Sequence, residues 1–138
     1  MILALDLDDT LLRSDKTVSE RTLAALRRWQ AAGHEIIVAT GRPPRHIRAV
    51  LPPELHTVPC IAYNGACAMV DGEIVYRSEI SPDDVRAVLD WTAVNRPHWN
   101  VGLEIDDQLY LNRASSKPGP YTVADLWTLC DRPAAKVI

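Results

Sequence analysis

The chain is predicted to fold as an α/β protein built on a parallel sheet, for three reasons. The apolar run Ile2–Leu5 is too short to cross a membrane and suits a strand buried on both faces. A helical pattern separates it from a second apolar run, Glu35–Ala39, which gives a right-handed βαβ unit. Each run ends in polar residues, at the carboxyl end of the strand, where open α/β sheets bind their ligands.

The composition is that of a globular protein and excludes several classes of function. The chain has 138 residues, of which 47% are apolar and 24% charged, enough for one domain or a small core with an appended one. Its net charge of -3 argues against nucleic-acid binding, which needs clustered Lys and Arg. Cys60, Cys67 and Cys130 form no C-x-x-C, so we expect neither a zinc site nor a disulfide framework, and we expect a cytoplasmic protein. We expect no signal peptide and no membrane partner.

The first helix has clear end signals. Ser19 is a good N-cap, and Gly33 offers the C-terminal stop. Leu23, Leu26 and Trp29 supply the buried stripe, so core packing is favoured over a cofactor contact for Trp29.

A third strand is expected at residues 59–63, followed by the turn pair Asn64-Gly65. From residue 67 to residue 76 the pattern is that of a hairpin around Asp71-Gly72.

A second unit is expected to start near Ser81, which is the N-cap of another helix. The predicted apolar face of that helix consists of Val85, Val88, Leu89 and Trp91. Further along, the pattern predicts strands at residues 100–105 and 108–112, a short helix at 123–130 and a strand from 135. Asp106 and Asp107 form the turn between the two strands, which is favoured over a metal site.

Asp6 and Asp8 are the first candidate site residues. Side chains two apart in an extended segment point to the same side, so both carboxylates can face one small volume. A hard cation such as Mg²⁺ would offset their repulsion, and an ionised aspartate can also attack phosphorus. The alternative is an acidic turn whose carboxylates are solvated or cap backbone amides.

The second run ends in Thr40, Gly41 and Arg42, followed by a helix that starts at Pro43 or Pro44. The threonine supplies a hydroxyl, the glycine lets the backbone come close to a ligand, and the start of the helix has free amides. Together these groups suit the binding of a phosphate. The alternative is a plain strand-to-helix turn with Arg42 in solvent.

The stretch DLDDTLL after an apolar strand resembles the first motif, D-x-D-x-T, of the haloacid dehalogenase-like (HAD) hydrolases. The resemblance implies that Asp6 is the nucleophile and Asp8 the general acid and base. It also implies that both belong to a Mg²⁺ site. The commonest residue of the family at position 9 is Gly, whereas this chain has Asp9.

Two later stretches extend the resemblance. ATGRP is similar to the second motif of the family, which implies that Thr40, with Gly41 and Arg42, binds the transferring phosphoryl group. YNGA is typical of the Cof-like or type IIB subgroup, which implies that Asn64 lies at the rim of the site. The implied fold is a Rossmann-like core with a partial parallel sheet, residues 1–78, and an inserted, incomplete α+β cap domain, residues 79–138.

The implied function is a Mg²⁺-dependent phosphatase of small phosphorylated metabolites, such as sugar phosphates, acting through an aspartyl-phosphate. The alternatives are a phosphomutase and a non-catalytic module that binds metal or phosphate. Receiver domains also use a phospho-Asp, but their nucleophile ends a later strand.

The later lysine and the acidic metal-binding segment of the family are not found in this sequence. Lys117 lies in a Pro-Gly loop and Lys136 in the last strand, so neither receives that role. We therefore expect the chain to be the N-terminal portion of a longer protein and to show weak or no turnover alone. Its three-stranded core should leave one sheet edge unpaired, which favours self-association.

Overall fold

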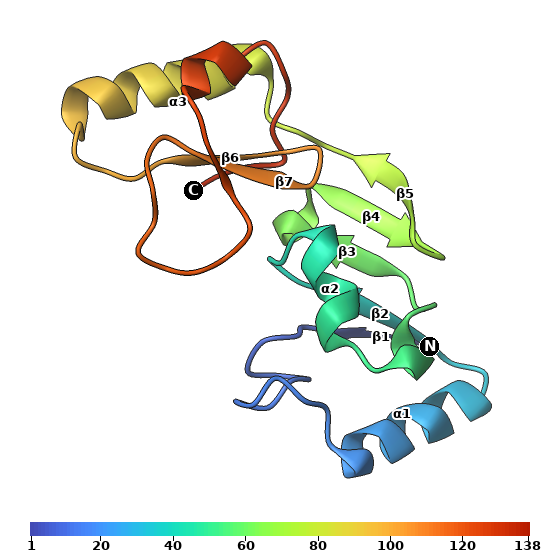
Figure 1. The fold of residues 1–138 in the computed structure, drawn as a ribbon. Helices are drawn as coiled ribbons and strands as arrows, with labels where there is room; N and C mark the ends of the chain where they lie inside the picture. Colours follow the sequence, from blue (N-terminus) through green and yellow to red (C-terminus); the bar gives the residue numbers. More distant parts are fainter. The chain divides into compact units, whose positions relative to one another are not determined.

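The computed structural model describes residues 1–138, which divide into two compact units, Met1–Arg77 and Ser78–Ile138. In the first unit the elements are β1 (Ile2–Leu5), α1 (Glu20–Ala31), β2 (Glu35–Ala39), α2 (Pro44–Val50), the 3-10 helix η1 (Pro53–Leu55), β3 (Cys60–Ala62), the 3-10 helix η2 (Tyr63–Gly65), β4 (Cys67–Val70) and β5 (Glu73–Arg77) (Figure 1). In the second unit they are α3 (Pro82–Asn95), β6 (Gly102–Ile105), β7 (Gln108–Leu111), β8 (Thr122–Val123), the 3-10 helix η3 (Leu126–Leu129) and β9 (Lys136–Val137).

The first unit is built on a five-stranded sheet in the order β1-β2-β3-β4-β5. The first three strands are parallel, which confirms the predicted α/β class with a parallel sheet. The core has more strands than the three that were expected, because the predicted hairpin of β4 and β5 pairs antiparallel with β3. The hairpin turn forms at Asp71 and Gly72, which both have positive φ.

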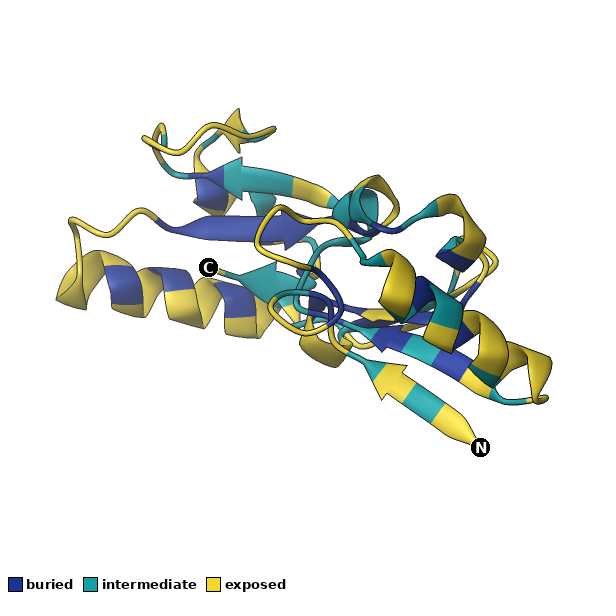
Figure 2. Ribbon diagram, turned by 90° about the horizontal axis from the view of Figure 1, so that it is seen from below, coloured by how far each residue is buried: buried dark blue, intermediate teal, exposed yellow.

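The expectation that β1 is buried on both faces is wrong. It is the edge strand of the sheet, and Ile2 is 62% exposed. Figure 2 shows this ribbon, next to the N-terminus, as exposed and intermediate along its length. The first fully buried residue of the segment is Leu7, which follows the strand and separates Asp6 from Asp8.

Helix α1 has the predicted ends. The Ser19 hydroxyl accepts a hydrogen bond from the Thr22 backbone N–H at 3.1 Å, and Gly33 has a left-handed φ of 78°. The Trp29 indole donates to the Glu35 carbonyl oxygen at 3.0 Å. That bond ties the end of the helix to the start of β2 and gives Trp29 a structural role.

In helix α3 the buried stripe differs from the predicted one. Val85, Leu89 and Thr92 are buried, at the spacing i, i+4, i+7, while Val88 and Trp91 are exposed. The stripe packs in the core of the second unit, which consists of Val85, Leu89, Val101, Leu103, Ile105, Leu126, Cys130 and Ala134.

The second unit carries a four-stranded sheet in the order β8-β7-β6-β9. The hairpin of β6 and β7 turns at Asp106 and Asp107, both with positive φ, as predicted. The predicted helix at residues 123–130 is wrong in extent, because β8 takes its start and η3 covers only Leu126–Leu129. Pairing of Thr122–Val123 with β7 outweighs the local helical pattern.

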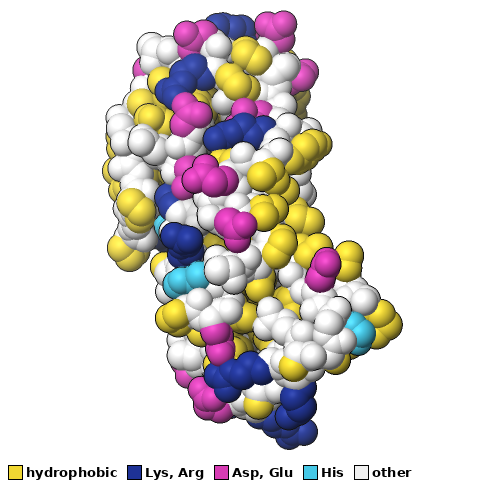
Figure 3. Space-filling view, turned by 90° about the vertical axis from the view of Figure 1, so that its right-hand side faces the viewer, with side chains coloured by type: hydrophobic (Ala, Val, Ile, Leu, Met, Phe, Trp, Pro, Cys, Tyr) yellow, Lys and Arg dark blue, Asp and Glu magenta, His cyan; other side chains and the backbone are white.

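Acidic and basic side chains are interspersed over the face drawn in Figure 3. All three cysteines are buried, and none of them forms a disulfide. None of the helices combines the length and the apolar character needed to cross a membrane.

Asp9 has a left-handed backbone with φ 59°, which favours glycine and tolerates aspartate. Replacement of Asp9 by glycine should therefore leave the free energy of unfolding unchanged or raise it. Glycine relieves the strain of the left-handed backbone, and this gain offsets the greater freedom that glycine gives to the unfolded chain. Replacement by valine should lower it by about 1–2 kcal/mol. Urea denaturation of both variants tests this expectation, and an Asp9→Val protein as stable as the parent would contradict the assigned backbone.

Candidate functional site

A hollow of about 300 Å³ lies at the carboxyl ends of the parallel strands β1, β2 and β3. Its lining residues are Asp6, Ala39, Thr40, Gly41, Ile61, Asn64 and Gly65. Four of the six predicted site residues therefore share one concave surface, although they come from three separate parts of the sequence. The other two, Asp8 and Arg42, contact each other directly.

Asp6 follows β1 and lines the hollow with an exposed side chain. Its backbone carbonyl accepts a hydrogen bond from the Leu11 N–H at 3.2 Å, and the Leu7 carbonyl accepts one from the Leu12 N–H at 2.8 Å. These bonds fold the segment after β1 into a tight turn that presents the Asp6 carboxylate. No protein group donates to that carboxylate, so its oxygens are available to an electrophile or a cation.

Thr40 is buried at the end of β2, with 6% of its surface exposed. Its hydroxyl oxygen accepts a hydrogen bond from the Arg42 backbone N–H at 3.2 Å. Because the oxygen acts as an acceptor there, the hydroxyl proton is left to donate. A phosphoryl oxygen in the hollow is a suitable acceptor for that proton.

The turn after β3 fixes the loop after β2. Backbone N–H groups of Tyr63 and Asn64 donate to the carbonyls of Arg42 and Thr40, each at 3.1 Å. Tyr63 and Asn64 have positive φ values of 52° and 57°, a costly conformation for residues other than glycine. The side chain of Asn64 then lies so close to Gly41 that a Cβ on that glycine would meet the Asn64 Oδ1 at 2.6 Å.

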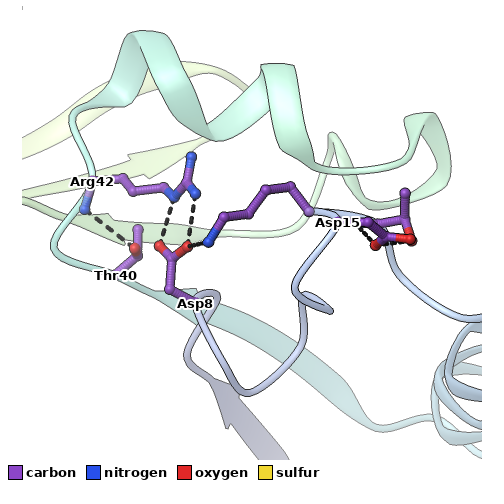
Figure 4. Close-up of polar contacts among 6 residues, drawn as sticks. Asp8, Asp15, Thr40 and Arg42 are labelled. Carbon is purple, nitrogen blue, oxygen red and sulfur yellow. Dashed lines mark hydrogen bonds and ion pairs between the residues drawn. The ribbon is translucent and has the colours of Figure 1, made fainter. Parts of the chain in front are cut away.

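The Asp8 carboxylate is held by two cations from different parts of the chain (Figure 4). Arg42 donates from Nε to Oδ2 and from Nη2 to Oδ1, both at 2.7 Å. Lys16 donates from Nζ to Oδ1 at 2.8 Å. The hydrogen bonds from Arg42, and then those from Lys16, hold the pKa of Asp8 well below its usual range.

This pairing rules out the simpler picture of Arg42 as a side chain in solvent, because only 21% of it is exposed. Sequence reasoning missed Lys16 altogether. The available signal was Asp15 two residues before Thr17, a spacing typical of a side-chain-capped turn. That signal predicts a turn, but it does not say which side chain the turn directs toward Asp8.

Asp6 and Asp8 were also predicted to hold a metal ion. No group of three or more His, Cys, Asp or Glu side chains gathers anywhere in the chain. Mg²⁺ tolerates such a sparse set, since it keeps several waters and binds through one or two carboxylates plus substrate phosphates. The unpaired Asp6 carboxylate fits this pattern, while the Asp8 carboxylate is already neutralised.

A larger hollow, of about 630 Å³, lies elsewhere, in the second unit between α3 and the β8–η3 segment. Its lining residues include Leu89, Trp99, Leu126 and Trp127. It contains none of the predicted site residues.

Titration of Asp8 tests its environment. In the ligand-free protein this carboxyl group should stay ionised as the pH falls through about 4, the ordinary value for aspartate. Because the folded pKa is lower than the unfolded one, the pair contributes stability above about pH 4, which is lost as the pH falls toward the folded value. Carboxyl-carbon NMR on the parent, Arg42→Leu and the control Arg21→Leu checks this. Arg42→Leu alone should raise the pKa of Asp8, and an ordinary pKa in the parent would contradict the ion pair.

A methyl group at Gly41 tests the packing of the hollow. Gly41→Ala should push the exposed Asn64 amide aside and weaken the binding of inorganic phosphate severalfold. The free energy of unfolding should change by less than about 1 kcal/mol, because only the end of a side chain has to move. Gly119→Ala is the matched control, since a Cβ there meets nothing within 4 Å. Equal phosphate affinity of the two variants would show that the Gly41–Asn64 contact does not shape the site.

The chain is similar to several known proteins. The 5-amino-6-(5-phospho-D-ribitylamino)uracil phosphatase of Bacillus subtilis (strain 168) is 34% identical over 114 residues, which are 80% of this chain and 42% of that protein. The solved structure of the HAD subclass IIB sugar phosphatase BT4131 matches with a TM-score of 0.65 at 27% identity, over 80% of this chain and 43% of that one. TM0651 from Thermotoga maritima shares the fold, with a TM-score of 0.77 at 21% identity over 99% and 54% of the two chains.

The chain thus spans less than half the length of the Bacillus subtilis relative. A model of the haloacid dehalogenase-like hydrolases matches residues 3–127, which is most of the chain. The resemblance noted in the sequence is confirmed: the chain belongs to the haloacid dehalogenase-like hydrolase family.

Proposed function

We propose that this chain carries the phosphoryl-transfer site of a Mg²⁺-dependent phosphatase that acts on small phosphorylated metabolites. One observation supports this proposal more than any other. The Asp6 carboxylate, free of protein hydrogen bonds, shares a hollow with the Thr40 hydroxyl, which has a proton to donate. A nucleophile and a phosphoryl-oxygen donor therefore face the same small volume.

In the first step, an Asp6 oxygen attacks the phosphorus of the substrate and the bond from phosphorus to the ester oxygen breaks. The departing oxygen takes a proton from Asp8, and the phosphoryl group remains on Asp6 as an acyl-phosphate. Thr40 and the backbone at Gly41 hold the phosphoryl oxygens during the transfer, with Arg42 beside them and Asn64 at the rim. The roles of Asp6 and Asp8 follow the family motif.

In the second step, water attacks the phosphorus, Asp8 accepts the proton of the water, and the bond to Asp6 breaks to release phosphate. Asp8 is ionised in its pair with Arg42 and is therefore ready to act as this base. Before the first step it has to gain a proton, so the pair with Arg42 has to loosen when substrate binds. The Asp6 carboxylate and the Asp8 backbone carbonyl would hold Mg²⁺, which when bound offsets the charge of the phosphoryl group.

The wider proposal rests on the family. Residues 1–78 would form the catalytic core and residues 79–138 part of a cap that selects the substrate, here a small phosphorylated metabolite. The phosphatase names of the relatives support that substrate class. Cysteines that form no disulfide suit a cytoplasmic location, and the exposed edge at β1 offers a surface for self-association.

Substitution of the nucleophile tests the proposal. Asp6→Asn should lower the single-turnover rate of phosphate release from a phosphorylated metabolite by about a thousandfold or more, because the amide cannot form the acyl-phosphate. Asp9→Asn is the matched control and should retain the rate, since Asp9 lies outside the hollow.

Measurable phosphate release by the parent that Asp6→Asn retains in full would overturn the assigned nucleophile. With a hexose phosphate as substrate, an isomeric product in place of inorganic phosphate would indicate a phosphomutase. Binding of phosphate with no release from any ester would indicate a non-catalytic module.

A further inference from the structure

Lys16 and Arg42 place two cations on one carboxylate. The Asp8 Oδ1 oxygen accepts from Lys16 Nζ at 2.8 Å and from Arg42 Nη2 at 2.7 Å, while Oδ2 accepts from Arg42 Nε. One negative charge thus faces two positive charges, which leaves one positive charge in excess within this cluster.

The turn that carries Lys16 is held by its own hydrogen bonds. The Asp15 Oδ1 oxygen accepts from the Thr17 backbone N–H at 3.0 Å and from the Thr17 hydroxyl at 2.6 Å. The Arg13 N–H donates to the Thr17 carbonyl at 2.8 Å, and the Lys16 N–H donates to the Arg13 carbonyl at 2.9 Å. Figure 4 shows this capped turn at Asp15 on the side of Asp8 opposite Thr40.

Lys16 itself has a positive φ of 63°. A left-handed backbone is costly for a lysine and persists only where the surrounding contacts impose it. Here the capped turn and the bond to Asp8 impose it. A lysine that served only solubility would need neither feature.

Both cations keep unused donors. An ammonium group has three N–H donors and a guanidinium group five, whereas Asp8 takes one from Lys16 and two from Arg42. An anion can therefore make its first contact with both cations while their bonds to Asp8 are intact, before the pair with Arg42 loosens for the first step. The backbone of Arg42 also adjoins Thr40, whose side chain lines the hollow.

We propose that Lys16 is a substrate-binding residue that, together with Arg42, holds the dianionic phosphoryl group beside Asp8. This inference rests on the proposed function and adds to it a residue that no motif of the family identifies in this sequence. It would also explain how a site rich in aspartates can bind a strongly anionic ligand. Asp8 would orient the two cations, and the cations would attract the phosphoryl group.

The test measures binding of inorganic phosphate by calorimetry to the parent and to three variants, with and without Mg²⁺. Lys16→Met keeps the aliphatic stem and removes the charge, Lys16→Arg keeps the charge, and Lys117→Met removes an exposed loop lysine of the second unit. Lys16→Met should bind phosphate about three- to tenfold more weakly, because it loses one charge-assisted hydrogen bond from a half-exposed side chain. Lys16→Arg should restore most of the affinity, and Lys117→Met should match the parent.

A purely structural role for Lys16 gives a different result. Lys16→Met would then lower the thermal stability and leave the phosphate affinity and its salt dependence unchanged, which would overturn the inference. Parent protein that binds no phosphate would overturn it as well. Asp6→Asn separates the two proposals: it should still bind phosphate while losing turnover. If it does so and Lys16→Met binds phosphate as the parent does, the proposed function stands and the role of Lys16 is wrong.

Discussion

The bidentate ion pair between Asp8 and Arg42 joins the segments that follow β1 and β2, and the geometry of the site depends on it. The turn after β3 adds two backbone hydrogen bonds to the same loop. Three loops of different sequence position therefore fix one another around the hollow. With 39% of the Asp8 side chain exposed, the pair is worth about 1 kcal/mol or less in stability, so its main effect is to position groups.

The same pair resolves a difficulty that the sequence raises. Three aspartates within four residues should repel a phosphorylated ligand, yet only Asp6 presents a free carboxylate to the hollow. Asp8 is neutralised by its two cations, and Asp9 lies outside the lining. The acidic motif thus keeps one free carboxylate while the local charge is offset, which suits an anionic ligand.

Features set by nearby residues were predictable from the sequence. The caps at Ser19 and Ser81, the hairpin turn at Asp106-Asp107 and the extent of β2 all follow local rules and are confirmed. Convergence of Asp6, Thr40 and Asn64 was predictable because parallel strands end at one edge of a sheet.

What depends on tertiary contacts was not predictable. The exposure of β1 depends on whether strands lie on both sides of it. The apolar run alone does not show whether they do. Val88 and Trp91 were predicted to be part of the apolar face of α3, but they lie beside the buried stripe and are exposed. Lys16 contacts Asp8 from a turn in which its own backbone is left-handed, and no propensity of lysine indicates such a backbone.

The identity of the phosphorylated residue tests the proposed mechanism most directly. An acyl-phosphate on aspartate is reduced by borohydride to homoserine, and peptide mass spectrometry locates the converted residue. After incubation with a phosphorylated metabolite and Mg²⁺, the proposed mechanism predicts homoserine at position 6 in the parent and none in Asp6→Asn. Conversion at Asp8 or Asp9, or no conversion while phosphate is released, would contradict it.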